Sequence, residues 1–465
     1  MSIANEMSLD LSGLRARFSG ELLLPGENGY DAARRVWNAA VDRRPALIAR
    51  CRGAADVQAA LGFAQAAGLP VSIRGGGHHW AGYAVWDDAV MIDLSLMKGV
   101  SVDVERGRAV AEGGVLWGEL DQATQAVGLA TTGADVPSVG IAGHTLGAGT
   151  GWLHRVAGLS SDNLLSAQVV TADGEVVRAA EDENPDLFWA MRGGGGNFGV
   201  ATSFEFRLHP VRHLYGGIVL HPLERGREAL QLYQELSECA SDELFLRAML
   251  MTAPPAPFMP EPLRGRPAVM LLAAHFGLPQ EGEEALRPLR RFGPPAVDAF
   301  HPMGYLELQQ LAGQGPPPVV RAYGRDHWLG GLDSSAIEAL VSAATELPSP
   351  VAMIHLQQMG GAVSRVPEDA TPFAYRHAAH HVGIFGLSLP ATDPDSVARW
   401  TRAVGEALRP ASLGGGAVNF LLPDEGEEAV RAAYGPEKLS RLAATKARYD
   451  ASNLLRVNAN IEPAS

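Results

Sequence analysis

The sequence predicts an α+β fold divided between two domains. Its 465 residues are more than one ordinary hydrophobic core accommodates. Up to about residue 210, short strand-like runs alternate with glycine-dense turns and short amphipathic helices. Beyond that point prolines become frequent and the helical patterns lengthen. We therefore expect an α+β first domain and a second domain in which an antiparallel sheet is backed by helices.

The first region alternates between helix-like and strand-like segments. Apolar residues at helical spacing predict helices, and short apolar runs bounded by turn residues predict strands. The expected helices are 57–67, 116–127 and 186–191, and the expected strands are 70–73, 90–94, 101–104, 108–112, 164–170 and 176–178. The last two strands flank Asp173-Gly174, a dipeptide typical of a hairpin corner.

The later regions contain longer elements. The expected helices are 225–238, 335–346, 426–434 and 439–449, and the expected strands are 269–274, 354–357 and 382–389. Near its end the chain carries Asn458 and Asn460 close together. Two asparagines at this spacing suit contacts to a ligand or to backbone groups better than a solvated tail.

Composition and charge exclude several classes of function. The net charge of −14, with a sequence pI near 5.5 and no run of basic residues, argues against nucleic acid and anionic membranes as partners. Cys51 and Cys239 lie far apart, so we expect two buried, reduced cysteines rather than a disulfide or a zinc site. No stretch is apolar enough to span a membrane, and residues 1–20 lack the apolar run of a secretory signal. We therefore expect a cytoplasmic protein.

A glycine-rich loop at 74–82 carries the strongest chemical signal. It reads RGGGHHWAG and follows the predicted strand 70–73. Successive glycines let the backbone approach a ligand closely, and their N–H groups form a concave nest that suits a pyrophosphate. Further glycine-dense blocks lie at 133–151 and 192–199. Three such turns predict one extended nucleotide cofactor, held by its phosphates, with a histidine beside its reactive ring.

Four stretches, in their order along the chain, resemble the berberine-bridge-enzyme-like flavoproteins of the vanillyl-alcohol-oxidase group. They are the loop at 74–82, the Val-Gly-x-x-Gly-His stretch at 139–144, residues 195–200, and the terminal signature from Tyr449 to Asn460. The resemblance covers nearly the whole chain. It implies a p-cresol-methylhydroxylase (PCMH)-type FAD-binding domain at 30–212 and a substrate-binding domain at 213–410. The C-terminal segment at 411–465 would then return to the FAD-binding domain.

The resemblance also implies how FAD is held. His78 is expected to be joined covalently to the 8α-methyl of FAD; the alternative is a noncovalent FAD with His78 as a hydrogen-bonding loop residue. The cysteine that forms a second tether in many relatives falls on Val136, so a single covalent bond is implied. The residues expected to contact FAD are Arg74, Gly75, Gly76, Gly77, His78, His79, Gly82, Pro137, Val139, Gly140, Gly143, His144, Asn163, Gly195, Asn197, Gly199, Val200, Asn419, Asn458 and Asn460.

The usual catalytic base of this family is missing. The tyrosine of the family's Tyr-x-Asn stretch falls on Ala417, which cannot accept a proton. The replacement candidates are His355, on a predicted strand, and Tyr375 and His377, which alternate in the same way and would share one face. For each of these residues the alternative is an ordinary hydrogen-bonded polar group on a buried sheet.

The resemblance implies an FAD-dependent oxidase. Hydride would pass from a small organic or secondary-metabolite substrate to flavin N5, and O2 would reoxidise the flavin. A flavin-dependent oxygenase of a biosynthetic pathway and a flavin-binding protein without catalysis remain as alternatives. His377, His380 and His381 suggest a metal site, but no carboxylate lies at helical spacing near them, so we expect no metal.

Overall fold

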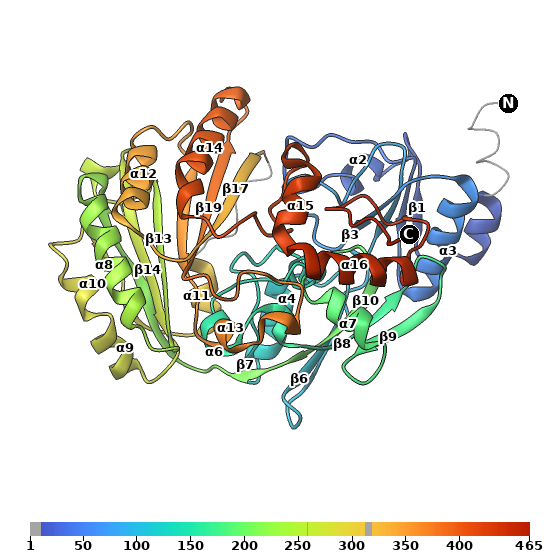
Figure 1. Cartoon of the computed structure of the whole chain (residues 1–465), viewed down its shortest axis with the longest axis horizontal. Helices are drawn as coiled ribbons and strands as arrows, with labels where there is room; N and C mark the ends of the chain where they lie inside the picture. Colours follow the sequence, from blue (N-terminus) through green and yellow to red (C-terminus); the bar gives the residue numbers. More distant parts are fainter. Residues whose placement is uncertain (1–10, 258, 312–318) are drawn as a thin grey trace.

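The computed structural model describes residues 11–257, 259–311 and 319–465. The chain forms two lobes that lie side by side along the long axis of the molecule (Figure 1). One lobe contains the sheets formed by residues 21–210, and the other contains a larger sheet formed by residues 214–388. The α+β class expected from the sequence is confirmed.

The first lobe contains a four-stranded sheet in the order β1-β2-β4-β3. Its strands are β1 (Glu21–Leu23), β2 (Leu47–Arg50), β3 (Val71–Arg74) and β4 (Val90–Asp93). Strand β1 is antiparallel to β2, whereas β4 is parallel to both β2 and β3. Helix α3 (Ala54–Ala67) connects β2 to β3 and ends at Gly68, whose φ of 63° forms the left-handed cap that glycine favours. This crossover brings the end of β3 directly into the glycine-rich loop.

A second sheet in this lobe is antiparallel, in the order β5-β6-β10-β8-β9. Its strands are β5 (Val100–Asp103), β6 (Arg108–Glu112), β8 (Leu164–Val170), β9 (Val176–Ala180) and β10 (Val200–Arg207). The predicted hairpin at Asp173-Gly174 is confirmed, since β8 pairs with β9 and Gly174 has a φ of 87°. The short strands β7 (Leu129–Ala130) and β11 (His209–Pro210) form a separate pair.

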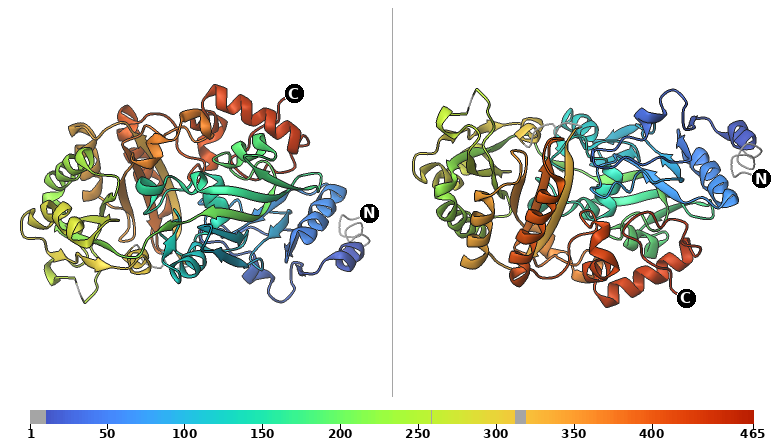
Figure 2. Two further views of the ribbon diagram at one scale, coloured as in Figure 1. Left: turned by 90° about the horizontal axis from the view of Figure 1, so that it is seen from below. Right: turned by 90° about the horizontal axis from the view of Figure 1, so that it is seen from above.

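Several short helices lie between the strands of the first lobe. They are α2 (Tyr30–Ala33), α4 (Trp117–Gln125), α5 (Ile141–Leu146), α6 (His154–Ala157) and α7 (Pro185–Met191). The C-terminal helices α15 (Gly426–Tyr434) and α16 (Pro436–Tyr449), red in Figures 1 and 2, lie on this lobe too. Tyr434 and Leu442 share a hydrophobic core with Phe198 and Trp189, which lie more than two hundred residues earlier. The end of the chain therefore completes the core of the first lobe.

The second lobe is built on an eight-stranded antiparallel sheet in the order β15-β12-β14-β13-β18-β19-β17, with β16 also paired to β12. The strands are β12 (Leu214–Pro222), β13 (Leu244–Thr252), β14 (Pro267–His275), β15 (Val297–Asp298), β16 (His301–Met303), β17 (Arg321–Leu329), β18 (Met353–Gln358) and β19 (His380–Ser388). Helices α8 (Gly226–Cys239), α12 (Ser334–Thr345) and α14 (Pro394–Leu408) cover one face, where their apolar residues form a single core with the sheet. The other face is turned toward the first lobe (Figure 2).

Smaller helices complete the second lobe. They are α9 (Pro279–Ala285), α10 (Arg287–Arg291), α11 (Tyr305–Leu311) and α13 (Ala362–Arg365). Local signals fix the long helices, since Asp333 and Asp393 cap the first turns of α12 and α14 by accepting backbone N–H groups. Among the helices of the described residues, none has the length and apolar character that crossing a membrane requires.

Two sequence expectations differ from this fold. Cys51 is buried, but Cys239 is exposed at the end of α8, so the expectation of two buried cysteines is wrong for Cys239. The first lobe also begins before residue 30, because β1 adds an antiparallel edge strand to its four-stranded sheet. A three-residue strand of Glu21, Leu22 and Leu23 is too short to produce a recognisable alternation pattern.

Candidate active site

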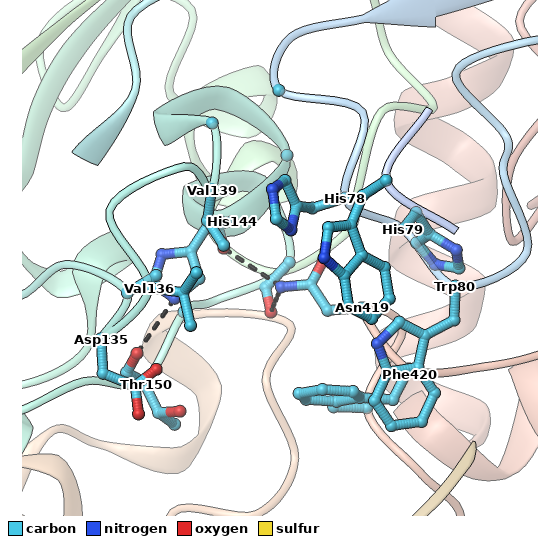
Figure 3. A pocket seen from close by; sticks show the side chains of 18 of the residues that line it. His78, His79, Trp80, Asp135, Val136, Val139, His144, Thr150, Asn419 and Phe420 are labelled. Carbon is cyan, nitrogen blue, oxygen red and sulfur yellow. Dashed lines mark hydrogen bonds between the residues drawn. The ribbon is translucent and has the colours of Figure 1, made fainter. Parts of the chain in front are cut away.

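A cavity of about 930 Å³ lies between the two lobes. Three glycine-rich segments of the first lobe, at 75–77, 140–149 and 194–199, line one side of it. The second-lobe sheet lines the opposite side of the cavity with the face that its helices leave uncovered. Residues 417–420 of the C-terminal segment line the cavity as well (Figure 3). The volume falls within the range of about 300–1,000 Å³ typical of ligand and cofactor sites.

The first two glycine segments touch one another directly. A Cβ atom on Gly76 would lie 2.2 Å from the backbone N of Gly140, and one on Gly140 would lie 2.3 Å from the N of Gly76. Gly77 adds a φ of 71°, a conformation that side chains other than glycine rarely adopt. Only glycines allow these two backbones to form one continuous wall, whose N–H groups suit the phosphates of a dinucleotide.

His78 follows this wall and lines the cavity. Its ring stacks on Trp37, with the ring centroids 5.5 Å apart, and makes no hydrogen bond to any residue that the structure describes. Burial, reinforced by the positive charge of Arg74, lowers the pKa of His78 to about 4. The imidazole is therefore neutral near pH 7 and keeps a free lone pair.

His79 differs from His78 because both of its ring nitrogens are occupied. Nε2 lies 3.1 Å from the carbonyl oxygen of Val418, and Nδ1 accepts the backbone N–H of Ala81 at 3.1 Å. The structure thus assigns different tasks to the two adjacent histidines. His79 anchors the C-terminal segment to the loop, whereas His78 is available to a ligand.

His144 and Asn419 join the second glycine segment to the C-terminal segment. Asn419 Nδ2 donates to the carbonyl oxygens of His144 and Gly147, each at 3.2 Å (Figure 3). The His144 ring contacts the carbonyl oxygen of Thr150 through Nε2, at 3.0 Å. Burial lowers the pKa of His144 to about 4, so it is a neutral structural group of the wall. Val136 also lines the cavity.

The third glycine segment is held by the end of the chain. The Asn197 side chain donates to the carbonyl of Ala459 and accepts the N–H of Ile461. Asn458 lines the cavity, and its buried Oδ1 has no hydrogen-bond partner among the described residues. This oxygen is a free acceptor for a ligand.

The structure brings most, but not all, of the expected FAD-contacting residues to the cavity. Those that line it are Gly75, Gly76, Gly77, His78, His79, Val139, Gly140, Gly143, His144, Gly195, Asn197, Gly199, Asn419 and Asn458. Those that do not are Arg74, Gly82, Pro137, Asn163, Val200 and Asn460. Asn163, for example, is buried and donates to the carbonyl oxygens of Ala157 and Leu159, so it shapes a turn.

His355 lies on the cavity face of β18. Its Nε2 is buried and has no hydrogen-bond partner among the described residues. Burial, with smaller contributions from Arg247 and His381, lowers its pKa well below the ordinary histidine value. It therefore presents an uncharged imidazole to whatever occupies the cavity.

The expectation for Tyr375 and His377 is wrong in its geometry. Residues 375–378 form a turn rather than a strand, His377 is exposed, and neither residue lines the cavity. The turn forms because Arg376 between them is buried and donates to Asp162 Oδ1 at 2.7 Å, on the other lobe. Tyr375 instead stacks on Trp328, with the ring centroids 5.3 Å apart.

Sequence reasoning missed two polar pairs at this site. Asp135, from the first lobe, forms an ion pair with Arg247 on β13, and Arg247 overcomes the effect of burial to hold the pKa of Asp135 below its usual value. Asp326 on β17 is buried 3.5 Å from His381 Nε2. It also accepts the N–H of Ala417 and the indole N–H of Trp328, both at 3.0 Å. The predicted strand at 382–389 begins one residue after His381, whereas β19 begins at His380. A strand extended backward by two residues would have placed His381 on the same face as Gly383.

The three histidines considered for a metal do not converge. His380 and His381 are neighbours on β19 and so point to opposite faces of the sheet, while His377 is exposed. Across the described ranges, no three His, Cys, Asp or Glu side chains form a group that could hold a metal ion.

The fold and the glycine-lined cavity are those of a flavoprotein. Residues 45–180 match the family model described as FAD binding domain, and residues 418–462 match the one described as berberine and berberine like. The chain is 32% identical over 461 residues to (R)-6-hydroxynicotine oxidase of Paenarthrobacter nicotinovorans, covering 96% of this chain and 97% of that protein. The chain therefore belongs to the berberine-bridge-enzyme-like family of FAD-linked oxidoreductases.

Solved structures agree with this assignment. The crystal structure of 6-hydroxy-D-nicotine oxidase from Arthrobacter nicotinovorans superposes with a TM-score of 0.84 at 29% identity, covering 96% of this chain and 98% of that one. The berberine-bridge-enzyme-like protein 1 of Physcomitrella patens has a TM-score of 0.85 at 23% identity, over 96% and 97% of the two chains. At this identity, the second likeness concerns the fold alone.

Proposed function

We propose that this protein is an oxidase with FAD joined covalently to His78, acting on a small organic substrate with O2 as the electron acceptor. The observation that carries the proposal is the contrast between the two adjacent histidines. His78 lines the cavity with both ring nitrogens free of hydrogen bonds to the described residues, whereas His79 is committed to Ala81 and Val418. A neutral imidazole with a free lone pair is the form that a carbon–nitrogen bond to the flavin requires.

Bound FAD would supply a hydride acceptor at N5 and would return the electrons to O2, releasing hydrogen peroxide. The task left to the protein is to position the substrate and to take up the proton that leaves with the hydride. His355 is suited to that task, because its buried Nε2 is unpartnered and faces the cavity. Its depressed pKa keeps it unprotonated before the substrate arrives.

The covalent bond is tested by denaturing gel electrophoresis. Wild-type protein should show flavin fluorescence that migrates with the polypeptide, and His78→Ala should lose it. His79→Ala is the matched control, because it removes an adjacent imidazole but leaves the attachment atom. Wild-type protein that releases all of its flavin on denaturation contradicts the tether.

The reaction is tested separately by measuring oxygen consumption and peroxide formation with substrates that bleach the flavin. Incorporation of ¹⁸O from ¹⁸O2 into the product would show that the protein is an oxygenase and not an oxidase. If no tested substrate bleaches the intact bound flavin, the result would favour a flavin-binding protein without catalysis.

A further inference from the structure

The second-lobe side of the cavity is an unusually methionine-rich surface. Four methionines from three adjacent strands line it, namely Met249, Met251, Met270 and Met353. They form one continuous patch, because Met249 lies opposite Met270 on β14, and Met251 lies opposite Met353 on β18. The intervening residues of β13, such as Leu250, face the helices on the other side of the sheet.

Further apolar residues of the cavity wall extend this methionine patch. Pro254 and Pro255 extend it beyond β13, and Phe385 and Leu387 extend it along β19. A ligand lying along this face would therefore contact thioether and hydrocarbon groups over most of its length. Burial of apolar surface against such groups contributes about 25 cal/mol per Å².

The charges on the cavity wall neutralise each other. Asp135 and Arg247 are the only acidic or basic side chains, histidine apart, among the described residues that line it, and they form an ion pair. Arg247 also donates to Gln357 Oε1, so the amide oxygen is occupied as well. A charged substrate would find no unpaired opposite charge there to compensate its loss of water.

One uncharged polar group on this face is left for a ligand next to the methionines. His355 lies directly opposite Met249 in the sheet, and its buried Nε2 has no partner among the described residues. The ring of His381 lies beside it, with the centroids 5.7 Å apart. This end of the apolar face therefore offers the uncharged imidazole of His355 to a hydroxyl group.

We infer, building on the proposed function, that the substrate is an uncharged and largely hydrocarbon molecule with a hydroxyl group at its reacting end. The hydroxyl lies at His355 and the hydrocarbon part lies along Met249, Met251 and Met353. Flexible methionine side chains adapt to different outlines, so the site accepts a range of hydrocarbon shapes. An oligosaccharide is disfavoured, since most of its hydroxyl groups would leave water without gaining a hydrogen bond.

The inference is tested by binding to the flavin-loaded protein, measured by calorimetry and by perturbation of the flavin spectrum under anaerobic conditions. The probes are 2-naphthylmethanol, its carboxylate analogue 2-naphthoate, the cationic 2-naphthylmethylamine, and cellobiose. The alcohol should bind at least tenfold more tightly than each of the other three. Tighter binding of the anion, the cation or the sugar overturns the inference, and so does a failure of the alcohol to bind.

Variants locate the binding surface. Met249→Gln and Met353→Gln keep the length of the side chain but place an amide on the patch, so each should weaken 2-naphthylmethanol binding at least fivefold. Met249→Leu and Met353→Leu are the matched controls, which retain an apolar surface and should keep affinity within about twofold. Equal affinity of the glutamine and leucine variants contradicts the proposed surface.

The outcome is separable from that of the proposed function. Protein with fluorescent, covalently held flavin that fails to prefer the alcohol contradicts only the substrate class. Protein that binds the alcohol but releases its flavin on denaturation contradicts only the tether at His78.

Discussion

The imidazole of His355 occupies the space that a side chain on Gly383 would need. The two residues are direct partners across β18 and β19, and a Cβ atom at position 383 would lie 2.5 Å from His355 Nε2. Glycine at 383 thus leaves room for the His355 ring. The position of the proposed proton acceptor depends on the absence of one methyl group.

Gly383→Ala should therefore displace His355 and slow flavin reduction by substrate about tenfold, equivalent to about 1.4 kcal/mol of barrier. The measurement is anaerobic stopped-flow spectroscopy of the flavin band. Gly331→Ala is a control, because no atom lies within 4 Å of its Cβ position. An unchanged reduction rate in Gly383→Ala would show that His355 does not act in the reaction.

The pH dependence of the same rate should be flat where an ordinary histidine titrates. Burial lowers the pKa of His355 well below the usual value, which is about 6.5. The base form therefore persists as the pH falls through that region, and the rate should decline only at more acidic pH. A loss of rate centred near pH 6.5, with a substrate that does not itself titrate there, would contradict the assignment.

The glycine wall should not tolerate a single methyl group. In Gly76→Ala the new Cβ would meet the backbone of Gly140, which cannot move as a side chain can. We expect the purified variant to carry less than a tenth of the wild-type flavin per polypeptide, measured by absorbance. Gly62→Ala in α3 has open space around its Cβ position and should retain full flavin and gain about 1 kcal/mol of stability. Full flavin content in Gly76→Ala would argue against the wall as the phosphate site.

Asp326 should hold the C-terminal segment against the cavity. Asp326→Ala removes the acceptor of the Ala417 N–H and leaves a buried donor unsatisfied, at a cost of about 1–3 kcal/mol. Hydrogen exchange at 416–420 should accelerate about tenfold or more, while exchange in the loop at 75–79 stays unchanged. Asp326→Asn keeps an acceptor oxygen and should show a smaller effect. Equal exchange in wild type and Asp326→Ala would show that this bond does not hold the segment.

A buried carboxyl group between the lobes should make stability depend on pH. Burial raises the pKa of Asp121 to about 8, despite a hydrogen bond donated by Gln309. The unfolded value is about 3.9, so the native state binds the extra proton between about pH 4 and pH 8. The free energy of unfolding contributed by Asp121 is therefore full below about pH 4 and is lost as the pH rises through about 8.

Asp121→Asn cannot titrate and keeps an acceptor for Gln309. The difference in free energy of unfolding between Asp121→Asn and wild type should shift in favour of the variant by at least about 1 kcal/mol as the pH rises from about 5 to about 9. Urea unfolding at each pH measures this difference. Parallel pH dependences of the two proteins would show that Asp121 is ionised in the native state.

The sequence alone determined the local features of this protein. Glycines at 75–77 and around 140 signal a wall that few other residues could form. Apolar periodicity located helices such as α3, α4 and α8. Both signals depend on neighbours along the chain. Local alternation failed at Tyr375 and His377, where Arg376 reaches Asp162 on the other lobe and bends the chain into a turn. No local pattern contains that partner.

Only the tertiary structure decided what faces the cavity. Pairing of β13 with β14 and β18 gathered four methionines and His355 on one surface, from positions as much as 106 residues apart. Asp135 and Arg247 neutralise each other although 112 residues separate them. Such contacts depend on strand register and on the packing of the two lobes, and apolar burial over the whole chain fixes both. Local sequence patterns therefore cannot reveal them.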